Sequence, residues 1–448
     1  MSNGDPSVIG IVVSEADPAS VTIGEQLLSL AEWESRQATD DVITARFDHA
    51  HFEVCYFAEM HLQLESVADY FSDPSLIVFV SRHAGETGPV LTAHFPGNVG
   101  DAEYGGSAYT VPPAAPVALS NIIQSFCHYA PDEFDVTLEC THHGPTDVGA
   151  PCLFAEVGSG MAEWSDPRPA KAVAQAVLDL EPREHWSSQR TVIGLGGSHY
   201  APRFDRIVRE TDWSVGHIGA DWSLKQLSGH EQTAAVIESL LEQSNASRIL
   251  LDGSDKLIAD VSLEIEHAIV SETWLRETTG VDLDLVENIE ELVGTIDSGT
   301  RIGNITDVSP RTITVDKLHP EFLREILRAN ADKSIDLVAA NTVAYRTTEN
   351  GNRLTGTIAT TGQSAREHLI ESLFPLVENR YKSLSREGDE LVVVEAVFDP
   401  ERARACGVPE GPKFGRLANG EPVDIDGTEI RPSDVINTVE RRFPIWES

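Results

Sequence analysis

Two adjacent histidines follow a short apolar run in the sequence Val136-Thr137-Leu138-Glu139-Cys140-Thr141-His142-His143-Gly144-Pro145. Residues 136–140 carry the β-branched and apolar side chains of a buried strand, and the Gly144-Pro145 pair ends it. Both imidazoles are therefore expected just past the C-terminal end of a strand. Ligands bind at this edge of open α/β sheets, so the pattern predicts an α/β fold with a functional site at residues 139–143.

Strand and helix patterns alternate through residues 1–285. Apolar runs of strand length occur at residues 7–13, 42–47, 75–80, 136–140, 153–157, 191–195 and 248–251. Amphipathic helical patterns occur at residues 23–30, 117–126, 171–180 and 231–242. This alternation predicts a mixed, mainly parallel sheet with helices on both faces.

The remaining residues, 286–448, have a different pattern. A hairpin is predicted where residues 342–345 and 354–358 flank the turn Glu349-Asn350-Gly351-Asn352. We therefore expect two domains, an α/β domain over 1–285 and an α+β extension over 286–448. Thirteen of the 15 histidines belong to the first domain, so the catalytic centre is expected there.

The chain is strongly acidic. Its 72 Asp and Glu residues against 33 Lys and Arg give a formal net charge of -39, and only seven of the basic residues are lysines. This composition is typical of a halophile, because molar salt shortens the Debye length to about 3 Å and screens the repulsion between surface carboxylates. In such salt a local arginine cluster can still bind phosphate, so the charge does not exclude an RNA substrate.

The sequence shows no sign of a membrane segment or of disulfide bonds. No run of 18 apolar residues occurs, and residues 1–6 lack the basic and apolar regions of a signal peptide. The five cysteines are odd in number and form no C-x-x-C pair, so neither a disulfide framework nor a zinc ribbon is indicated. We expect a cytoplasmic, monomeric protein that does not contact membranes.

Four polar turns in the first domain each place a histidine after an apolar run. They are Ser81-Arg82-His83, Ala93-His94-Phe95-Pro96-Gly97-Asn98, Glu139-Cys140-Thr141-His142-His143-Gly144 and Gly194-Leu195-Gly196-Gly197-Ser198-His199-Tyr200. Any one of these histidines could be a structural imidazole held by a hydrogen bond. Four such turns at the strand ends of one sheet would converge on a single crevice, which favours a functional site.

This crevice has side chains for binding a metal ion or for activating water. The candidate metal ligands are Glu139, His94, His142, His143 and His199. The candidate catalytic residues are His142, His143, Glu139 and Ser198. There is no G-x-S-x-G or H-E-x-x-H motif, so a metal-bound water or a histidine general base is the expected chemistry. Neighbouring side chains on a strand point to opposite faces, so one of His142 and His143 is expected to face away or to serve a second metal.

The glycine turn at residues 194–199 is a candidate site for an anion or a developing oxyanion. It matches neither a dinucleotide fingerprint nor a P-loop, but glycines after a strand allow the backbone to approach a ligand closely. The candidate substrate-binding residues are Gly196, Gly197, His199, Arg203 and Asn98.

Taken together, these turns resemble the archaeal and plant type of D-aminoacyl-tRNA deacylase. The resemblance is carried by the first two turns, by residues 138–146 and by residues 194–204, and it extends over about residues 5–280. It implies a hydrolase that removes mischarged D-amino acids from tRNA by cleaving their ester bond. In such an enzyme the turn at residues 196–198 is expected to hold the ester carbonyl or the terminal phosphate, and Arg203 is expected to contact the acceptor stem. The resemblance also implies a zinc cofactor and a fold similar to peptidyl-tRNA hydrolases and nucleoside phosphorylases. It does not indicate which residues bind zinc.

Two other interpretations stay open. A peptidyl-tRNA hydrolase or a nucleoside phosphorylase-like enzyme would share the sheet architecture, and a non-catalytic metal- or tRNA-binding protein would use the histidines structurally. In the C-terminal extension, residues 407–417 are similar to a G-V-P-x-G-P segment of the tRNA 3′-processing metallo-β-lactamase enzymes. A contribution of the extension to tRNA handling is therefore a further hypothesis.

Overall fold

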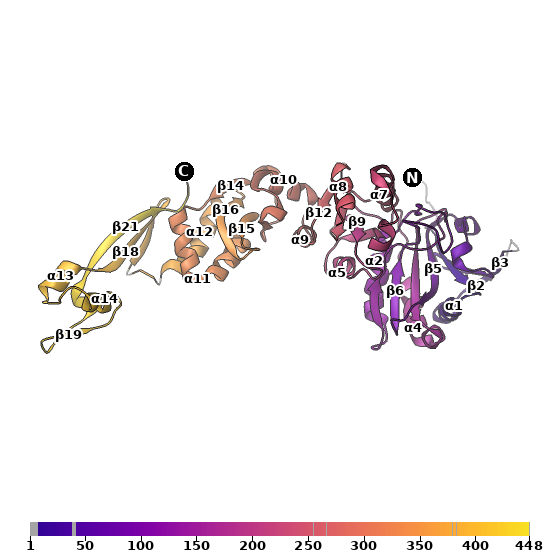
Figure 1. The fold of residues 1–448 in the computed structure, drawn as a ribbon, viewed down its shortest axis with the longest axis horizontal. Helices are drawn as coiled ribbons and strands as arrows, with labels where there is room; N and C mark the ends of the chain where they lie inside the picture. Colours follow the sequence, from indigo (N-terminus) through magenta and orange to yellow (C-terminus); the bar gives the residue numbers. More distant parts are fainter. Residues whose placement is uncertain are drawn as a thin grey trace. The chain divides into compact units, whose positions relative to one another are not determined.

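The chain forms two compact units in a computed structural model (Figure 1), residues Met1–Thr279 and Gly280–Ser448. The structure describes residues 8–37, 42–253, 255–265, 267–378, 380–381 and 383–447. Ser7, where the first expected strand begins, and residues 1–6 lie outside the described residues. The expected boundary between residues 285 and 286 lies inside helix α10 (Leu283–Val293).

A mixed eight-stranded sheet forms the centre of the first unit. Its strands are β1 (Val8–Ser14), β2 (Glu34–Arg36), β3 (Ile43–His49), β4 (Phe52–Phe57), β5 (Pro74–Ala84), β6 (Val90–His94), β7 (Asp135–Leu138) and β8 (Cys152–Ser159), in the order β2-β3-β4-β1-β5-β8-β6-β7. Strands β4, β1, β5 and β8 run parallel, and their apolar sequences suit a sheet centre that is buried on both faces. The expected mixed, mainly parallel α/β architecture is confirmed.

A second, fully parallel sheet lies in the same unit. Its strands are β9 (Thr191–Gly196), β10 (Ser214–Gly219), β11 (Arg248–Asp252) and β12 (Ala268–Val270), in the order β10-β9-β11-β12. The expectation that all four histidine turns end strands of one sheet is therefore wrong, because the turn that carries His199 follows β9 of this smaller sheet.

The segment after β7 joins the two sheets. The Cys140 amide donates to the His199 carbonyl at 2.9 Å, and the Thr141 amide donates to the Ile218 carbonyl at 2.9 Å. Glu139 and Tyr200 form an isolated antiparallel bridge. These backbone bonds hold the ends of β7 and β9 together, so the histidine turns of both sheets meet.

Helices flank both sheets of the first unit. They are α1 (Pro18–Leu30), α2 (Pro116–Tyr129), α3 (Met161–Trp164), α4 (Pro167–Leu178), α5 (Pro202–Glu210), α6 (Asp221–Leu224), α7 (Gly229–Ser244), α8 (Lys256–Glu264) and α9 (Glu272–Glu277). Helices α1, α2 and α4 pack against strands of the large sheet (Figure 1). Asp17 starts α1 by accepting hydrogen bonds from the Ala19 and Ser20 amides, as N-cap residues do. No helix among the described residues has the length and apolar character needed to cross a bilayer.

The second unit is α+β. It comprises α10, β13 (Thr300–Ile302), β14 (Thr314–Lys317), α11 (Pro320–Asn341), β15 (Ala344–Thr348), β16 (Arg353–Thr360), α12 (Gln363–Glu378), β17 (Ser383–Glu387), β18 (Glu390–Phe398), α13 (Pro400–Ala405), α14 (Pro412–Ala418), β19 (Val423–Ile425), β20 (Thr428–Ile430) and β21 (Ile436–Pro444). Strands β15 and β16 pair antiparallel across residues 349–352, which confirms the predicted hairpin. Helices α11 and α12 pack together and share a core with this hairpin, β18 and β21.

Candidate active site

A cavity of about 430 Å³ opens where β5 and β6 end and the segment after β7 begins. Its lining includes Asp17, His61, Arg82, His83, Tyr104, His142, His143, Glu156 and His199. All of these residues belong to the first unit. The structure thus brings three of the four histidine turns to the cavity wall, and the fourth contributes His94 directly behind it, 4.1 Å from the His142 ring.

Three imidazoles pack against one another at this cavity. The ring centroid of His94 lies 4.1 Å from that of His142 and 4.8 Å from that of His143, and the last two are 4.4 Å apart. Of the two alternatives expected for the adjacent pair, that one ring faces away is wrong, because β7 has already ended at Leu138 and His143 has a φ of 47°. With this left-handed backbone at His143, both rings face the cavity. That one of them serves a second metal stays a prediction.

The same three imidazoles are oriented in the same way by the backbone. The Nδ1 atoms of His94, His142 and His143 lie 3.0, 2.8 and 2.8 Å from the carbonyl oxygens of Phe95, Cys140 and Gly144. A carbonyl can only accept, so each Nδ1 carries the proton and donates it. Each Nε2 is therefore the atom available to a ligand, which is how metal-binding histidines are commonly fixed.

Burial keeps two of these histidines neutral. Burial, together with repulsion from neighbouring imidazoles, holds the pKa of His142 well below its usual value. The same causes lower the pKa of His143 from 6.5 to about 4. At neutral pH both side chains therefore have a free electron pair on Nε2, with which they can bind a metal ion or accept a proton.

Glu139 is a buried carboxylate at the centre of the site. Its Oε2 accepts from His199 Nε2 at 2.7 Å, and its Oε1 lies 3.1 Å from His83 Nδ1. Burial alone would raise the pKa of Glu139, but the His199 and His83 imidazoles outweigh burial and hold the pKa well below its usual value. Glu139 is thus ionised although it is only 1% exposed.

Glu156 is a second buried carboxylate that the sequence interpretation missed. It accepts a hydrogen bond from Ser81 at 2.5 Å, and it lies 3.6 Å from both His83 Nδ1 and His94 Nε2. Burial alone would raise the pKa of Glu156, but these imidazoles lower it. One feature of the sequence could have revealed Glu156: it is the single carboxylate in strand β8, whose residues are all buried.

The two carboxylates change the protonation of the histidines beside them. Burial alone would lower the pKa of His83, but Glu139 and Glu156 raise it to about 11. Burial also acts to lower the pKa of His94, but Glu156 again outweighs it and the pKa is raised. The site thus combines cationic and neutral imidazoles within one network.

Cys140 lies on the His199 side of the site. Its thiol is 3.7 Å from His199 Nδ1. Burial raises the pKa of this thiol to about 12, and a hydrogen bond from the Trp222 side chain partly opposes the rise. The thiol is therefore protonated at neutral pH and can interact with a metal ion only if the ion displaces that proton.

Three groups of side chains could hold a metal ion. They are His94, His142 and His143; Cys140, His142 and His199; and His83, Glu139 and Glu156, with the ligand atoms of each group within 4.8 Å of one another. His94 Nε2 is buried without a hydrogen-bond partner among the described residues, and the nearby Glu156 Oε1 is 3.6 Å away. Buried polar atoms are normally satisfied, so the donor set and this unpartnered nitrogen fit a metal ion.

The other predicted substrate-binding residues pack against, or form ion pairs with, neighbouring parts of the protein. Gly196 and Gly197 have φ values of 106° and 83° and pack so closely against Asp252 that a Cβ atom would lie 2.1 and 2.7 Å from its oxygens. The guanidinium of Arg203 forms ion pairs with Asp252 and Glu272, both at 3.2 Å. These contacts hold the turn after β9 against the end of β11.

Ser198 and Asn98 also bond to the protein backbone. The Ser198 hydroxyl donates to the Tyr200 carbonyl. Asn98 is 5% exposed and donates to the carbonyls of Gly105 and Ser107 at 2.8 and 3.2 Å. Asn98 thus fixes the loop between β6 and α2.

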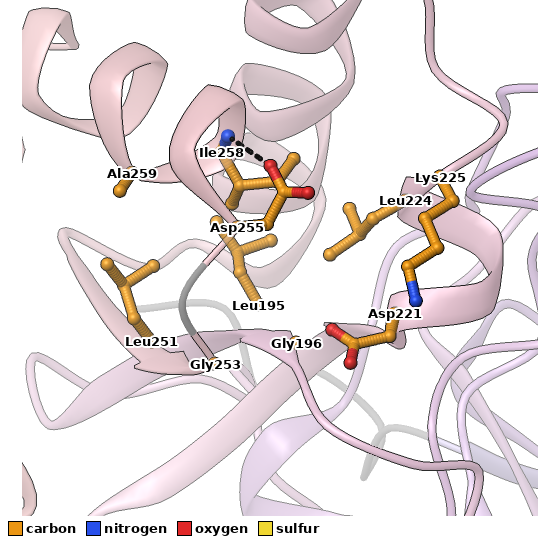
Figure 2. Close-up of a pocket in the computed structure, with 10 residues that line it drawn as sticks. All are labelled: Leu195, Gly196, Asp221, Leu224, Lys225, Leu251, Gly253, Asp255, Ile258 and Ala259. Atoms are coloured by element: carbon orange, nitrogen blue, oxygen red, sulfur yellow. Dashed lines mark hydrogen bonds between the residues drawn. The ribbon is translucent and has the colours of Figure 1, made fainter.

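A second, much smaller cavity lies at the ends of β9 and β11 (Figure 2). Figure 2 shows Gly196 and Gly253 at its floor, Asp255 on one side and Asp221 with Lys225 on the other. Its volume is about 20 Å³, which is enough for one water molecule. Asp255 is engaged in capping α8 through the Ile258 amide at 3.1 Å. This cavity is too small for a substrate, so the histidine cavity is the candidate active site.

Comparisons with known proteins agree with this location. The family model described as D-aminoacyl-tRNA deacylase matches residues 70–268, a range that includes His83, His94, His142, His143 and His199. The protein named D-aminoacyl-tRNA deacylase from Haloarcula marismortui is 40% identical, over 98% of this chain and 100% of that protein. The one from Natronomonas pharaonis is 41% identical, over 97% of this chain and 100% of that protein.

The chain belongs to the D-aminoacyl-tRNA deacylase family. Its fold is also similar to the crystal structure of a conserved protein of unknown function, AF0625, with a TM-score of 0.56 and 26% identity. That similarity covers 61% of this chain and 98% of the other. Family membership confirms the resemblance expected from the four histidine turns.

Proposed function

We propose that this chain hydrolyses the ester bond between a D-amino acid and the terminal ribose of tRNA, using water activated at the histidine cavity. One observation carries the proposal: three backbone-oriented imidazoles present Nε2 atoms to one another beside an ionised, buried Glu139. Aminoacyl esters are already activated, so a positioned water and a base are sufficient. The names of the family members supply the substrate class.

His94, His142 and His143 are the residues we propose to hold a zinc ion. Three imidazoles are a ligand set that catalytic zinc uses in other proteins. Bound there, zinc would supply Lewis acidity that makes a nearby water more acidic. Because Glu156 raises the pKa of His94, zinc binding would also displace a proton from that ring.

Other residues of the chain hold this arrangement in place. Glu139 accepts from His199 and fixes that ring, while Glu156 lies between His83 and His94. His142, whose Nε2 lies 3.8 Å from Glu139 Oε2, is placed to take a proton from water and to share its charge with that carboxylate. His142 thus has two alternative roles. It is one of the three proposed zinc ligands, or, if other side chains hold the zinc, it is the general base.

A substrate panel in molar potassium chloride tests the proposal. D-tyrosyl-tRNA should be hydrolysed, whereas L-tyrosyl-tRNA, N-blocked peptidyl-tRNA and a nucleoside with phosphate should not be converted. Strong turnover of peptidyl-tRNA or of the nucleoside would replace the proposal with one of those activities. No ester turnover with or without added zinc would indicate a binding protein instead.

Metal dependence is tested separately. Chelation should abolish turnover, and zinc should restore it with a defined stoichiometry. Activity that survives complete chelation would contradict the zinc assignment and leave His142 acting on water without a metal. The exposed His128 on α2 provides a matched control, since His128→Ala should change neither zinc content nor rate.

A further inference from the structure

Two exposed aromatic side chains lie close to the histidines of the candidate site. Among the Phe, Tyr and Trp side chains of the described residues, only Tyr104 and Trp222 are exposed, at 66% and 46%. A single exposed aromatic residue is ordinary on a protein surface. Here Tyr104 lines the histidine cavity, and Trp222 follows Asp221, whose amide bonds to the turn that carries His199.

Tyr104 lies on the loop between β6 and α2. It lines the histidine cavity, and its carbonyl accepts from the Gly144 amide at 2.9 Å, directly after His143. Asn98 fixes the loop by donating to Gly105, the residue that follows Tyr104, at 2.8 Å. The phenol is therefore exposed on a backbone that is held firmly beside the catalytic histidines.

Trp222 lies in the short helix α6. The Asp221 amide donates to the Gly197 carbonyl at 3.0 Å, which attaches this helix to the turn that carries His199. The Trp222 side chain lies near enough to the Cys140 thiol to lower its pKa, and that thiol contacts His199 at 3.7 Å. The indole is thus held near His199 while much of its surface stays exposed.

We propose that Tyr104 and Trp222 are stacking surfaces for the unpaired 3′-terminal nucleoside of the tRNA, which places its esterified ribose at the histidines. This inference rests on the proposed function. Unpaired bases are commonly bound by stacking on aromatic side chains, and each stacked base contributes about 1–3 kcal/mol.

The charge of the chain makes stacking the suitable contact. With a net charge of -39 the protein repels RNA at low salt, and molar salt screens attraction to phosphates as well as repulsion. Stacking buries apolar ring surface and needs no long-range charge. It is therefore a contact that retains its strength in the salt in which such an acidic chain is stable.

Binding of uncharged tRNA tests the inference without any turnover. In molar potassium chloride, the wild-type chain should bind intact tRNA about tenfold more tightly than the same tRNA lacking its terminal adenosine. Trp222→Ala and Tyr104→Ala should each reduce this preference severalfold, whereas Trp222→Phe and Tyr104→Phe should retain most of it. Leu263→Ala removes another exposed apolar side chain, 74% exposed, and should leave the preference unchanged.

Two small esters separate the stacking role from the chemistry. Each alanine variant should lower kcat/KM for 3′-O-D-tyrosyl-adenosine about tenfold, mainly through KM, and leave kcat/KM for D-tyrosine methyl ester unchanged. A parallel fall on both esters, or equal binding of the two tRNAs by the wild type, would overturn the stacking role. If the wild type hydrolyses neither ester but still prefers intact tRNA, the proposed function fails while the stacking role stands.

Discussion

His199 Nε2 lies 2.7 Å from Glu139 Oε2, although His199 follows β9 of the small sheet and Glu139 follows β7 of the large one. This hydrogen bond connects the two sheets at the candidate active site. The buried carboxylate is stabilised by imidazoles from both sheets, so the site requires the whole first unit to be folded.

The substitution Glu139→Gln tests this connection. It keeps the shape of the side chain but leaves the cationic His83 without one of its two carboxylates. Breaking a buried ion pair from one side costs about 3 kcal/mol, so the free energy of unfolding in urea should fall by about that amount. Glu238→Gln, on the exposed face of α7, is the matched control. Equal unfolding midpoints for both variants would show that Glu139 carries no buried charge.

The substitution Glu156→Gln tests the carboxylate that sequence reasoning missed. Glutamine can still accept from Ser81, but it removes the charge that raises the pKa of His94 and helps to orient its ring. Such supporting groups typically affect metal affinity 10- to 100-fold. Zinc titration of the apoprotein should show a loss of that size, and the free energy of unfolding should fall as it does for Glu139→Gln, because a buried partner of His83 and His94 is neutralised. Unchanged zinc affinity would mean that His94 is not a ligand.

The pH dependence of stability should report His217, which is fully buried. Its Nε2 donates to the Pro112 carbonyl at 2.8 Å, and its Nδ1 lies 3.0 Å from the Thr141 hydroxyl. Burial lowers its pKa from 6.5 to about 4, so the unfolded chain binds an extra proton between these values. The contribution of His217 to the free energy of unfolding is therefore fully present above pH 6.5. It decreases by about 3 kcal/mol as the pH falls toward 4.

Chemical unfolding of His217→Gln at pH 7 and pH 5 measures this effect. The variant should lose less stability than the wild type between the two pH values, although it is less stable at pH 7. His185→Gln, at an exposed position, is the control. An identical pH dependence in wild type and His217→Gln would contradict the assignment.

A chain that ends at Thr279 should keep the catalytic chemistry. Every residue of the histidine cavity lies in the first unit, so kcat for D-tyrosine methyl ester should stay within about twofold of the full chain. Comparing the affinities of the two chains for intact tRNA then tests whether residues 280–448 contribute to tRNA handling. Equal affinities would remove the second unit, including residues 407–417, from substrate binding.

Much of this arrangement could be predicted from local sequence. The strands β5, β8, β9 and β11 are largely apolar runs, and the turn at residues 349–352 marks its hairpin. Both signals could be recognised because each lies within a few adjacent residues. Strands β2, β4, β6, β10 and β12 were not among the predicted strand ranges. Strand β10, for example, reads Ser-Val-Gly-His-Ile-Gly and contains residues that are uncommon in strands.

The remaining features depend on contacts between distant parts of the chain. Glu156 acquires its role from Ser81 and His83, more than 70 residues earlier, and no local pattern reveals such partners. The common orientation of His142 and His143 depends on one left-handed residue, His143. The predicted role of Gly196 and Gly197 was a close approach of the backbone to a ligand, whereas the structure uses their lack of a side chain for packing against Asp252.

The rate at which His142→Ala deacylates D-tyrosyl-tRNA tests most directly whether the histidine cluster performs the reaction. Single-turnover measurements in molar potassium chloride, with zinc present, should give a rate about 10²- to 10⁴-fold below that of the wild type. The variant should keep its affinity for uncharged tRNA, because Tyr104 and Trp222, the proposed stacking surfaces, are intact. A rate within about threefold of the wild type would contradict the claim that the histidine cluster performs the reaction.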